Sequence, residues 1–336
     1  MENLNSIENW LDKNTYDYSI FSDLDYIESE LRKKNLSVSV IIPTLEEEST
    51  IEYILNIIIK KLYEKNKIVD EIIVIDGGSK DKTIDICKKY NKYIKIFNQK
   101  DIHEEINNGG KGEALWKSLF VCKGDIVVYI DSDIKDFTER FIVGIIGPML
   151  FNDDIKFVKG YYNRPLINSE NVKSNEGGRV TELCARPLLN LLYPDLGGFV
   201  QPLGGEYGGY RDVLENIKFT SGYGVEVQLL IEIYKKYGIK SMGQTNLYER
   251  IHRHQPINSL SKMSSAIMKT ILKKWINEES LNDSILIKNI LKENSEYVKA
   301  RSSNHLHCNC EGKNIDDNFK YVEITENELS EYSTLK

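Results

Sequence analysis

The sequence predicts an α/β fold with a mostly parallel central sheet flanked by helices. Short apolar runs rich in β-branched residues occur at 37–43, 72–75 and 126–130, and a polar turn follows each of them. Apolar residues at helical spacing separate these runs. This alternation of strand and helix implies parallel strands joined by right-handed crossovers.

The first half of the chain follows this pattern in a regular order. We expect a helical arm over 1–36, with a helix near 23–34, packed on the main domain. The run at 126–130 is apolar throughout, which suits a central strand buried on both faces. The other elements expected here are helices over 51–62, 83–90 and 113–121, a strand over 94–97 and a flexible loop over 107–112.

The second half of the chain is less regular. The sequence favours a strand at 158–162 and a long polar loop at 163–178, a kind of segment that often covers a site. The residues beyond about 299 are polar and acidic, so we expect a mobile tail there. The remaining expected elements are helices over 179–192, 226–237 and 264–276 and a glycine-rich segment over 201–210.

Composition and charge limit the classes of protein that this chain can form. Hydrophobic residues make up 41% of the 336 residues, which is enough for a substantial core. The net charge of -7 argues against nucleic acid as a partner held by overall charge. The cysteines are odd in number and scattered, so they imply no disulfide framework and fit a reducing compartment. They are Cys87, Cys122, Cys184, Cys308 and Cys310.

We expect neither a signal peptide nor a membrane-spanning segment in this sequence. Its first residues lack the basic and apolar regions of a signal peptide. The longest apolar candidate, 141–151, is too short to span a bilayer, and Gly144, Gly147 and Pro148 interrupt it. We therefore expect a soluble, cytoplasmic protein without a membrane partner.

The ends of the predicted strands converge on one crevice. In open α/β sheets, the ligand lies beyond the carboxyl ends of the strands. Those ends carry 43–47, 76–79 and 131–133 in this chain. No G-x-G-x-x-G motif or P-loop accompanies them, which disfavours an NAD enzyme or a P-loop ATPase.

The tripeptide Asp131-Ser132-Asp133 ends the central strand. Two carboxylates at the mouth of a buried strand are costly unless a positive charge neutralises them. Their oxygens suit Mg²⁺ or Mn²⁺. The alternative is a polar strand end in which Asp133 caps the next helix.

Seven motifs together resemble a known enzyme family. The segments PTLEEE, GKGEALW and DSD resemble the nucleotide-sugar half of GT-A glycosyltransferases, which have a Rossmann-like fold. The segments GGRVTELCARPLLN, QPLGGEY, GYGVE and IHRHQP are similar to glucosyl-3-phosphoglycerate synthases. The resemblance runs from about residue 38 to about residue 276, and the order of the later motifs makes it specific.

The resemblance implies a reaction and its participants. Glucose would pass from a nucleoside diphosphate glucose, with UDP-glucose preferred, to the 2-hydroxyl of 3-phosphoglycerate. The anomeric configuration would be retained, Mg²⁺ or Mn²⁺ would be bound, and the enzyme would be a homodimer. The product would feed compatible-solute or polysaccharide synthesis. The resemblance also divides the chain into a nucleotide-sugar half (37–136), an acceptor half (137–299) and a tail (300–336).

The resemblance implies a role for each matching residue. The nucleotide-sugar site would comprise Pro43, Thr44, Leu45, Glu47, Asp76, Lys111, Asp131, Ser132, Leu203 and Tyr223. The acceptor site would comprise Gly178, Arg179, Val180, Thr181 and His254. The metal ligands would be Asp133 and His252, and the catalytic residues Glu226, Asp133 and Arg179.

Two positions depart from the family pattern. Glu46 stands where the family usually has asparagine, which adds a negative charge near the nucleotide. His254 stands where asparagine is expected, two residues after the metal histidine. These departures bear on donor-base preference and on acceptor contacts.

Several residues keep a second interpretation. Arg179 at a helix start could pair with a phosphate or carboxylate, or form a surface ion pair with Glu182. Glu226 could act on the acceptor hydroxyl, or offset the helix dipole. His252 is assigned as a ligand only by family order. The His and Cys residues of 305–310 are spaced too tightly for a standard zinc site, and we interpret them as incidental.

Other functions remain as alternatives. Within the same class, the donor could be GDP-mannose, giving mannosyl-3-phosphoglycerate, or the acceptor a lipid phosphate. A non-catalytic nucleotide-sugar sensor would not need an acceptor pocket. A sugar-nucleotide pyrophosphorylase would need a glycine-rich, basic loop after the first strand, where this chain has the acidic segment TLEEEST.

Overall fold

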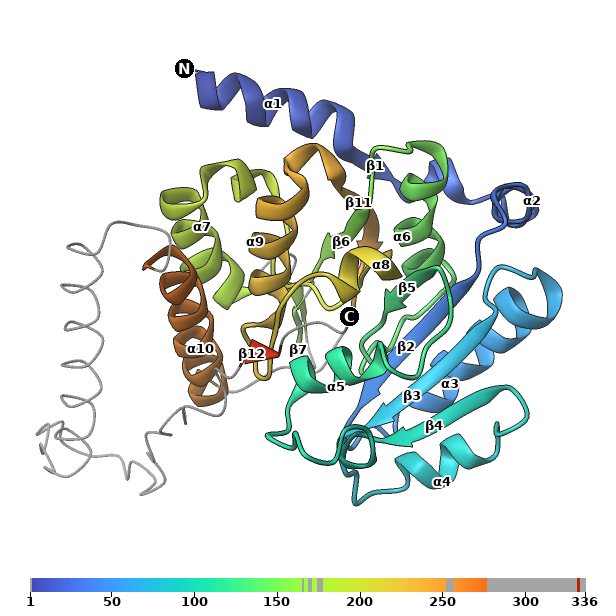
Figure 1. Ribbon diagram of the computed structural model, residues 1–336. Helices are drawn as coiled ribbons and strands as arrows, with labels where there is room; N and C mark the ends of the chain where they lie inside the picture. The colour runs from blue at the N-terminus through green and yellow to red at the C-terminus, as the bar shows by residue number, and fades with distance from the viewer. Residues whose placement is uncertain are drawn as a thin grey trace, which may run out of the picture.

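The computed structural model describes residues 2–164, 166–168, 171–173, 178–251, 257–276 and 331–332. One mixed sheet of eight strands forms its centre, in the order β1-β11-β6-β9-β5-β2-β3-β4, with helices packed around it (Figure 1). Strand β9 is antiparallel to both of its neighbours, and the other pairs of neighbouring strands are parallel. The predicted α/β fold with a mostly parallel sheet is therefore confirmed.

The strands of the main sheet come from nearly the whole described chain. They are β1 (Thr15–Asp17), β2 (Val38–Thr44), β3 (Glu71–Asp76), β4 (Ile94–Asn98), β5 (Ile126–Tyr129), β6 (Phe157–Asn163), β9 (Tyr207–Tyr210) and β11 (Met242–Glu249). Two small pairs lie outside it: β7 (Leu166–Asn168) with β8 (Asn171–Lys173), and β10 (Phe219–Thr220) with β12 (Glu331–Tyr332).

The helices connect these strands. The α-helices are α1 (Glu2–Asn14), α2 (Leu24–Lys34), α3 (Ile51–Ile57), α4 (Thr83–Lys88), α5 (Lys111–Ser118), α6 (Arg140–Phe151), α7 (Arg186–Leu192), α8 (Arg211–Glu215), α9 (Val225–Tyr237) and α10 (Ile257–Ile276). Two π-helical segments, η2 (Ile58–Lys65) and η4 (Thr181–Ala185), adjoin α3 and α7. Short 3₁₀ turns are η1 (Tyr18–Phe21), η3 (Gln99–Asp101), η5 (Pro194–Gly198) and η6 (Ile239–Ser241).

The central strands bury side chains on both faces. Ile41 and Val127 belong to one core, which also contains residues of α5 and α9. Val40 and Val128, one position along, belong to a second core with residues of α2, α3 and α6. Successive side chains of a strand point to opposite faces, so one apolar run supplies both cores. This explains why the apolar runs predicted the strands.

The glycine-rich segment over 201–210 contains strand β9, which was not predicted as a strand. Its residues pair with β5 on one side and with β6 on the other. At Gly208, a Cβ atom would lie 2.7 Å from the carbonyl oxygen of Val127. Glycine therefore allows the close approach of backbones in the middle of the sheet.

Two other segments differ from the sequence-based expectation. The segment 163–178, expected as a loop, contains the antiparallel pair β7–β8 within its described part. The arm over 1–36 contains the expected helix α2, and it also supplies β1 to the edge of the main sheet. The buried Trp10 Nε1 donates to the carbonyl oxygens of Ile239 and Met242, both at 3.0 Å, which fastens the arm to that edge.

Helix α6, the longest apolar candidate of the sequence, is a buried helix of the second core. Across the described residues, no helix combines the length and apolar character needed to cross a bilayer. Of the tail over 300–336, only Glu331–Tyr332 is described, and the His and Cys residues of 305–310 lie outside the described residues.

Gly112 in α5 provides a test of this packing. A Cβ atom there would lie 1.7 Å from the carbonyl oxygen of Thr220, which belongs to strand backbone. We expect Gly112→Ala to lower the free energy of unfolding by about 3 kcal/mol because the backbone has to move. Urea unfolding followed by circular dichroism measures this change.

Gly77→Ala is the matched control. A Cβ atom at Gly77 would lie 3.5 Å from the carbonyl oxygen of Thr44, an ordinary contact. This variant should lose less than about 1 kcal/mol. Equal losses in the two variants would contradict the close packing of α5 on β10.

Candidate active site

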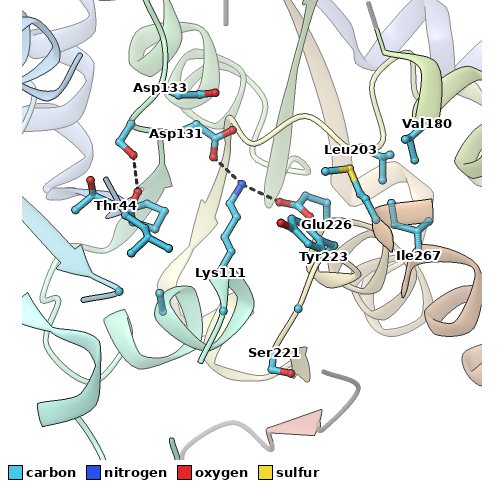
Figure 2. A pocket seen from close by; sticks show the side chains of 18 of the residues that line it. Thr44, Lys111, Asp131, Asp133, Val180, Leu203, Ser221, Tyr223, Glu226 and Ile267 are labelled. Carbon is cyan, nitrogen blue, oxygen red and sulfur yellow. Dashed lines mark hydrogen bonds and ion pairs between the residues drawn. The ribbon is translucent and has the colours of Figure 1, made fainter. Parts of the chain in front are cut away.

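A cavity of about 630 Å³ opens at the carboxyl ends of β2, β3 and β5. It brings together most of the residues that the sequence singled out (Figure 2). These are Pro43, Thr44, Leu45, Glu47, Lys111, Asp131, Ser132, Asp133, Gly178, Arg179, Val180, Thr181, Leu203, Tyr223 and Glu226.

Among the expected site residues that the structure describes, Asp76 is the one that does not line the cavity. The carboxylate of Asp76 accepts hydrogen bonds from the backbone N–H groups of Gly78 and Ser79 and from the Ser79 hydroxyl. Asp76 therefore shapes the turn after β3, from which Gly77 reaches the cavity. His252 and His254 lie outside the described residues.

Hydrogen bonds join the Asp131–Asp133 segment to the end of β2. The hydroxyl of Ser132 donates to the carbonyl oxygen of Pro43 at 2.9 Å. The hydroxyl of Thr50, at the start of α3, donates to the carbonyl oxygen of Ser132 at 2.6 Å. The two strand ends are therefore held in one geometry, with Asp131 and Asp133 on either side of Ser132.

Lys111 connects the two sides of the cavity. Its Nζ lies 2.6 Å from Asp131 Oδ1 and 2.9 Å from Glu226 Oε1, which comes from the first turn of α9 (Figure 2). Burial lowers the pKa of Lys111, but the charges of Asp131 and Glu226 outweigh burial and raise it well above its usual value. Lys111 is therefore a fixed positive charge between two carboxylates.

Arg250 is a second fixed positive charge and was not singled out from the sequence. It follows β11, its side chain is 4% exposed, and its Nη2 lies 2.8 Å from both Asp131 Oδ2 and Asp133 Oδ1. The same nitrogen lies 3.2 Å from Glu206 Oε1. Burial raises the pKa of Asp131, but Lys111 and Arg250 together hold it well below its usual value.

Buried polar side chains, those of Lys159, Tyr162 and Glu206, lie close to these residues. The hydroxyl of Tyr162 donates to Glu206 Oε2 at 2.5 Å, and the ammonium of Lys159 donates to the carbonyl oxygen of Gly204 at 2.5 Å. Burial raises the pKa of Glu206. Burial also lowers the pKa of Lys159 to about 7, against the opposing influence of the Glu226 charge.

The other end of the cavity combines an arginine with apolar side chains. Arg179 is exposed and follows Gly178, whose φ of +82° is unfavourable for other residues. Glu182, the suggested surface partner of Arg179, lies 2.9 Å from Arg186. Figure 2 places Val180, Leu203 and Ile267 together at this end. The arrangement suits an acidic ligand whose carbon skeleton rests on an apolar wall.

Ile251 is hydrogen-bonded to the chain that follows Asp133. The N–H of Ile251 donates to Asp136 Oδ1 at 2.8 Å, and the N–H of Lys135 donates to the carbonyl oxygen of Ile251 at 3.0 Å. Arg140 also contacts Asp136 at 2.7 Å. The last described residue before His252 is therefore paired with the chain two residues after Asp133.

Glu46 has an unusual backbone conformation. Its φ is +59°, in the left-handed region, which asparagine adopts more readily than glutamate. Its N–H donates to the hydroxyl of Ser79 at 2.9 Å, and its side chain is exposed. This backbone conformation would suit the asparagine that the resemblance leads us to expect at this position.

Several lining residues had no clear signal in the sequence. Arg164, Arg250, Leu260, Met263 and Ile267 line the cavity from segments that gave no motif of their own. Arg250 lies in the basic stretch LYERIHRHQP, two residues before His252, and that position was its only sequence signal.

Asp131 and Asp133 suit a divalent cation by their chemistry. Both present carboxylate oxygens at the end of a buried strand, as Mg²⁺ and Mn²⁺ prefer. Within the ranges that the structure describes, no three His, Cys, Asp or Glu side chains form a cluster suited to a metal ion. The two carboxylates therefore fit part of a metal site, and a further protein ligand would come from outside those ranges, where His252 lies.

Comparison with known proteins agrees with this geometry. Residues 39–166 match the family described as Glycosyl transferase family 2. The mixed sheet, the cavity at its strand ends and this match define a glycosyltransferase of the GT-A class, so the expected enzyme class is confirmed.

A relative that matches most of the chain identifies the family within this class of enzyme. The glucosyl-3-phosphoglycerate synthase of Petrotoga mobilis is 40% identical over 290 residues, which cover 85% of this chain and 89% of that protein. The chain belongs to the glucosyl-3-phosphoglycerate synthase family, as its motifs indicated.

Solved structures support the same assignment. Mannosyl-3-phosphoglycerate synthase from Rubrobacter xylanophilus has a TM-score of 0.73 at 35% identity, covering 81% of this chain and 84% of that one. Glucosyl-3-phosphoglycerate synthase from Mycobacterium tuberculosis, in complex with Mn²⁺, UDP-glucose and phosphoglyceric acid, has a TM-score of 0.66 at 38% identity. That match covers 74% of this chain and 82% of the other.

The lowered pKa of Lys159 predicts a specific pH dependence of stability. The folded protein releases this proton near a pH of about 7, whereas the unfolded chain holds it to about 10.4. Between these values the unfolded state binds more protons, so Lys159 makes the free energy of unfolding rise with pH. The free energy of unfolding of Lys159→Met should therefore rise less than that of the wild type between about pH 7 and about pH 9. Urea unfolding at several pH values measures this difference.

An exposed lysine serves as the control for this experiment. Lys67→Met should keep the pH dependence of the wild type, because Lys67 lies on the surface. Identical pH dependence in Lys159→Met and in the wild type would contradict the lowered pKa.

Proposed function

We propose that this enzyme transfers glucose from UDP-glucose to the 2-hydroxyl of 3-phospho-D-glycerate, with retention of the anomeric configuration. The observation that carries the proposal is the similarity to the Mycobacterium tuberculosis enzyme, which was solved with UDP-glucose and phosphoglyceric acid together. The cavity supports it, because Lys111 contacts a carboxylate on each of its two sides, Asp131 after β5 and Glu226 in α9.

The strand ends form the donor side of the proposed site. Pro43, Leu45 and Glu47 border the uracil and ribose, and Asp131 contacts the ribose or the waters bound to the metal. Asp133 and His252 hold Mg²⁺ or Mn²⁺, which supplies a Lewis acid for the charge that gathers on the departing diphosphate. Thr44, Lys111 and Ser132 complete this side of the site, and Leu203 and Tyr223 lie along the glucose and the acceptor hydroxyl.

The opposite end of the cavity holds the acceptor in this proposal. Arg179 pairs with the phosphate or carboxylate of 3-phosphoglycerate through its planar guanidinium. Gly178 removes a side chain that would block this approach, and Val180 and Thr181 extend the same wall. His254 contacts the acceptor in place of the asparagine usual in the family.

The proposed chemical step is a transfer on one face of the sugar. The bond between glucose C1 and the diphosphate oxygen breaks, and a bond forms from C1 to the 2-hydroxyl oxygen of phosphoglycerate. The hydroxyl proton passes to the departing phosphate oxygen. Glu226, held by Lys111 at 2.9 Å, orients the acceptor hydroxyl. Trapping a covalent glycosyl-enzyme would contradict this step.

A mannosyl donor is the second candidate. The Rubrobacter xylanophilus protein, which shares 35% identity with this chain, is a mannosyl-3-phosphoglycerate synthase. Glu46 lies in the turn that borders the proposed base site, where a change of residue bears on the choice of nucleotide.

The proposal also covers the setting of the enzyme. We infer a homodimer and a cytoplasmic location, in which the product supplies compatible-solute or polysaccharide synthesis. Sedimentation at several protein concentrations tests the dimer, and a monomer at every concentration would contradict it.

A product assay tests the reaction. Purified protein with 3-phosphoglycerate and Mg²⁺ should form glucosyl-3-phosphoglycerate from UDP-glucose, and a chelator should abolish the product. GDP-glucose and GDP-mannose are offered in parallel, and transfer from GDP-mannose alone would favour the second candidate. No transfer from any donor would contradict the proposed function.

Arg179→Lys tests the acceptor site. Lysine keeps the charge but loses the planar pair of donors, so the KM for 3-phosphoglycerate should rise about tenfold. The KM for the sugar nucleotide should change little. Arg186→Lys is the control, because Arg186 lies nearby on α7 and does not line the cavity. Equal effects of Arg179→Lys on both KM values would count against the assignment.

A further inference from the structure

Glu113 is a fully buried carboxylate beneath the loop that precedes α5. Its Oε2 accepts hydrogen bonds from the backbone N–H groups of Asn108 and Gly109, both at 2.9 Å. Asn108, Gly109 and Gly110 line the cavity, whereas Glu113 does not. Glu113 therefore contacts the wall of the site from behind.

Lys117, one turn further along α5, completes a buried pair. Its side chain and that of Glu113 are both 0% exposed, and Lys117 Nζ lies 3.0 Å from Glu113 Oε1. Lys117 also donates to the carbonyl oxygen of Gln99 at 2.9 Å, and Gln99 Nε2 donates to the carbonyl oxygen of Gly110 at 3.3 Å. Gln99 lines the cavity as well, so the pair connects two separate parts of its wall.

Stability alone is a weak reason for such a pair. Two charges lose their hydration on burial, and well-packed apolar side chains often replace a buried ion pair without loss of stability. Apolar side chains, however, could not accept hydrogen bonds from the backbone N–H groups of a loop. The loop has φ values of +78° at Gly109 and +89° at Gly110, and the N–H groups of Asn108 and Gly109 donate to Glu113 rather than to a helix or strand.

The loop lies at the nucleotide end of the proposed site. Gln99, which contacts Gly110, follows β4, and Ile75 and Gly77 line the same cavity from the end of β3. The loop leads directly into Lys111, whose ammonium joins Asp131 and Glu226. A shift of this loop would therefore move both the wall of the nucleotide site and the start of α5.

We propose that Glu113 is a positioning residue for the nucleotide of the donor. Its carboxylate holds the backbone of Asn108 and Gly109 in the conformation that receives a nucleoside diphosphate. Lys117 neutralises Glu113 and fixes its orientation. This inference rests on the proposed function, in which a nucleoside diphosphate sugar occupies the cavity. Preorganised walls of this kind reduce the cost of ordering a loop when the ligand binds.

Two double variants distinguish a role of Glu113 in positioning the loop from a role in the stability of the fold. Glu113→Met with Lys117→Met removes both charges and both acceptor oxygens. Glu113→Gln with Lys117→Met also removes both charges, but its amide oxygen can still accept the loop N–H groups. The three side chains at position 113 are similar in length, so the variants differ mainly in the acceptor.

Calorimetry with UDP and Mn²⁺ gives the main readout. The Met/Met variant should bind UDP about tenfold more weakly than the wild type, and the Gln/Met variant should recover most of this loss. The KM for UDP-glucose should follow the same order, while the KM for 3-phosphoglycerate stays unchanged. Equal UDP affinity in the two variants would overturn the inference.

Amide hydrogen exchange covers the case in which the Met/Met variant does not fold. In the wild type without ligand, the N–H groups of Asn108 and Gly109 should be protected, because Glu113 already accepts both. Rapid exchange at both positions would overturn the inference. A wild-type protein that fails to bind UDP would instead overturn the proposed function, so the two failures are distinguishable.

Discussion

The neutralisation of buried carboxylates governs the arrangement of this active site. Asp131 and Glu226 line the cavity, and Glu206, which has no exposed surface, contacts Arg250. A carboxylate in such a place is stable only beside a positive charge or a set of hydrogen bonds. Lys111 and Arg250 provide that charge, and each of them contacts more than one carboxylate.

These shared contacts connect parts of the chain that are distant in sequence. Lys111 begins α5, Asp131 follows β5, Glu226 lies in α9 and Arg250 follows β11. Because one cation serves carboxylates from different elements, none of these elements can shift without leaving a charge unpaired. These ion pairs therefore connect α5, α9 and the ends of β5 and β11 around the cavity.

The sequence predicted those features that depend on local pattern. Strands β2, β3 and β5 are apolar runs, and polar residues at their ends lie at the cavity as expected. Arg250 escaped prediction because its partners Asp131 and Asp133 are more than a hundred positions away, and no local pattern reports such a contact. Strand β9 escaped because its glycines give no alternation of side chains. Asp76 was expected at the nucleotide, but the backbone of its own turn uses the carboxylate.

The edge strand β1 has a consequence for the order of folding. It pairs with β11, and its residue Thr15 lies 229 positions before Gln244. Ribosomes add about 5–20 residues per second, so β1 leaves the ribosome roughly 10–50 s before its partner. Strands β2 to β5 are contiguous and can pair during that interval. Strand β1, which precedes the other strands of the main sheet in the chain, is therefore among the last to find its place in the sheet.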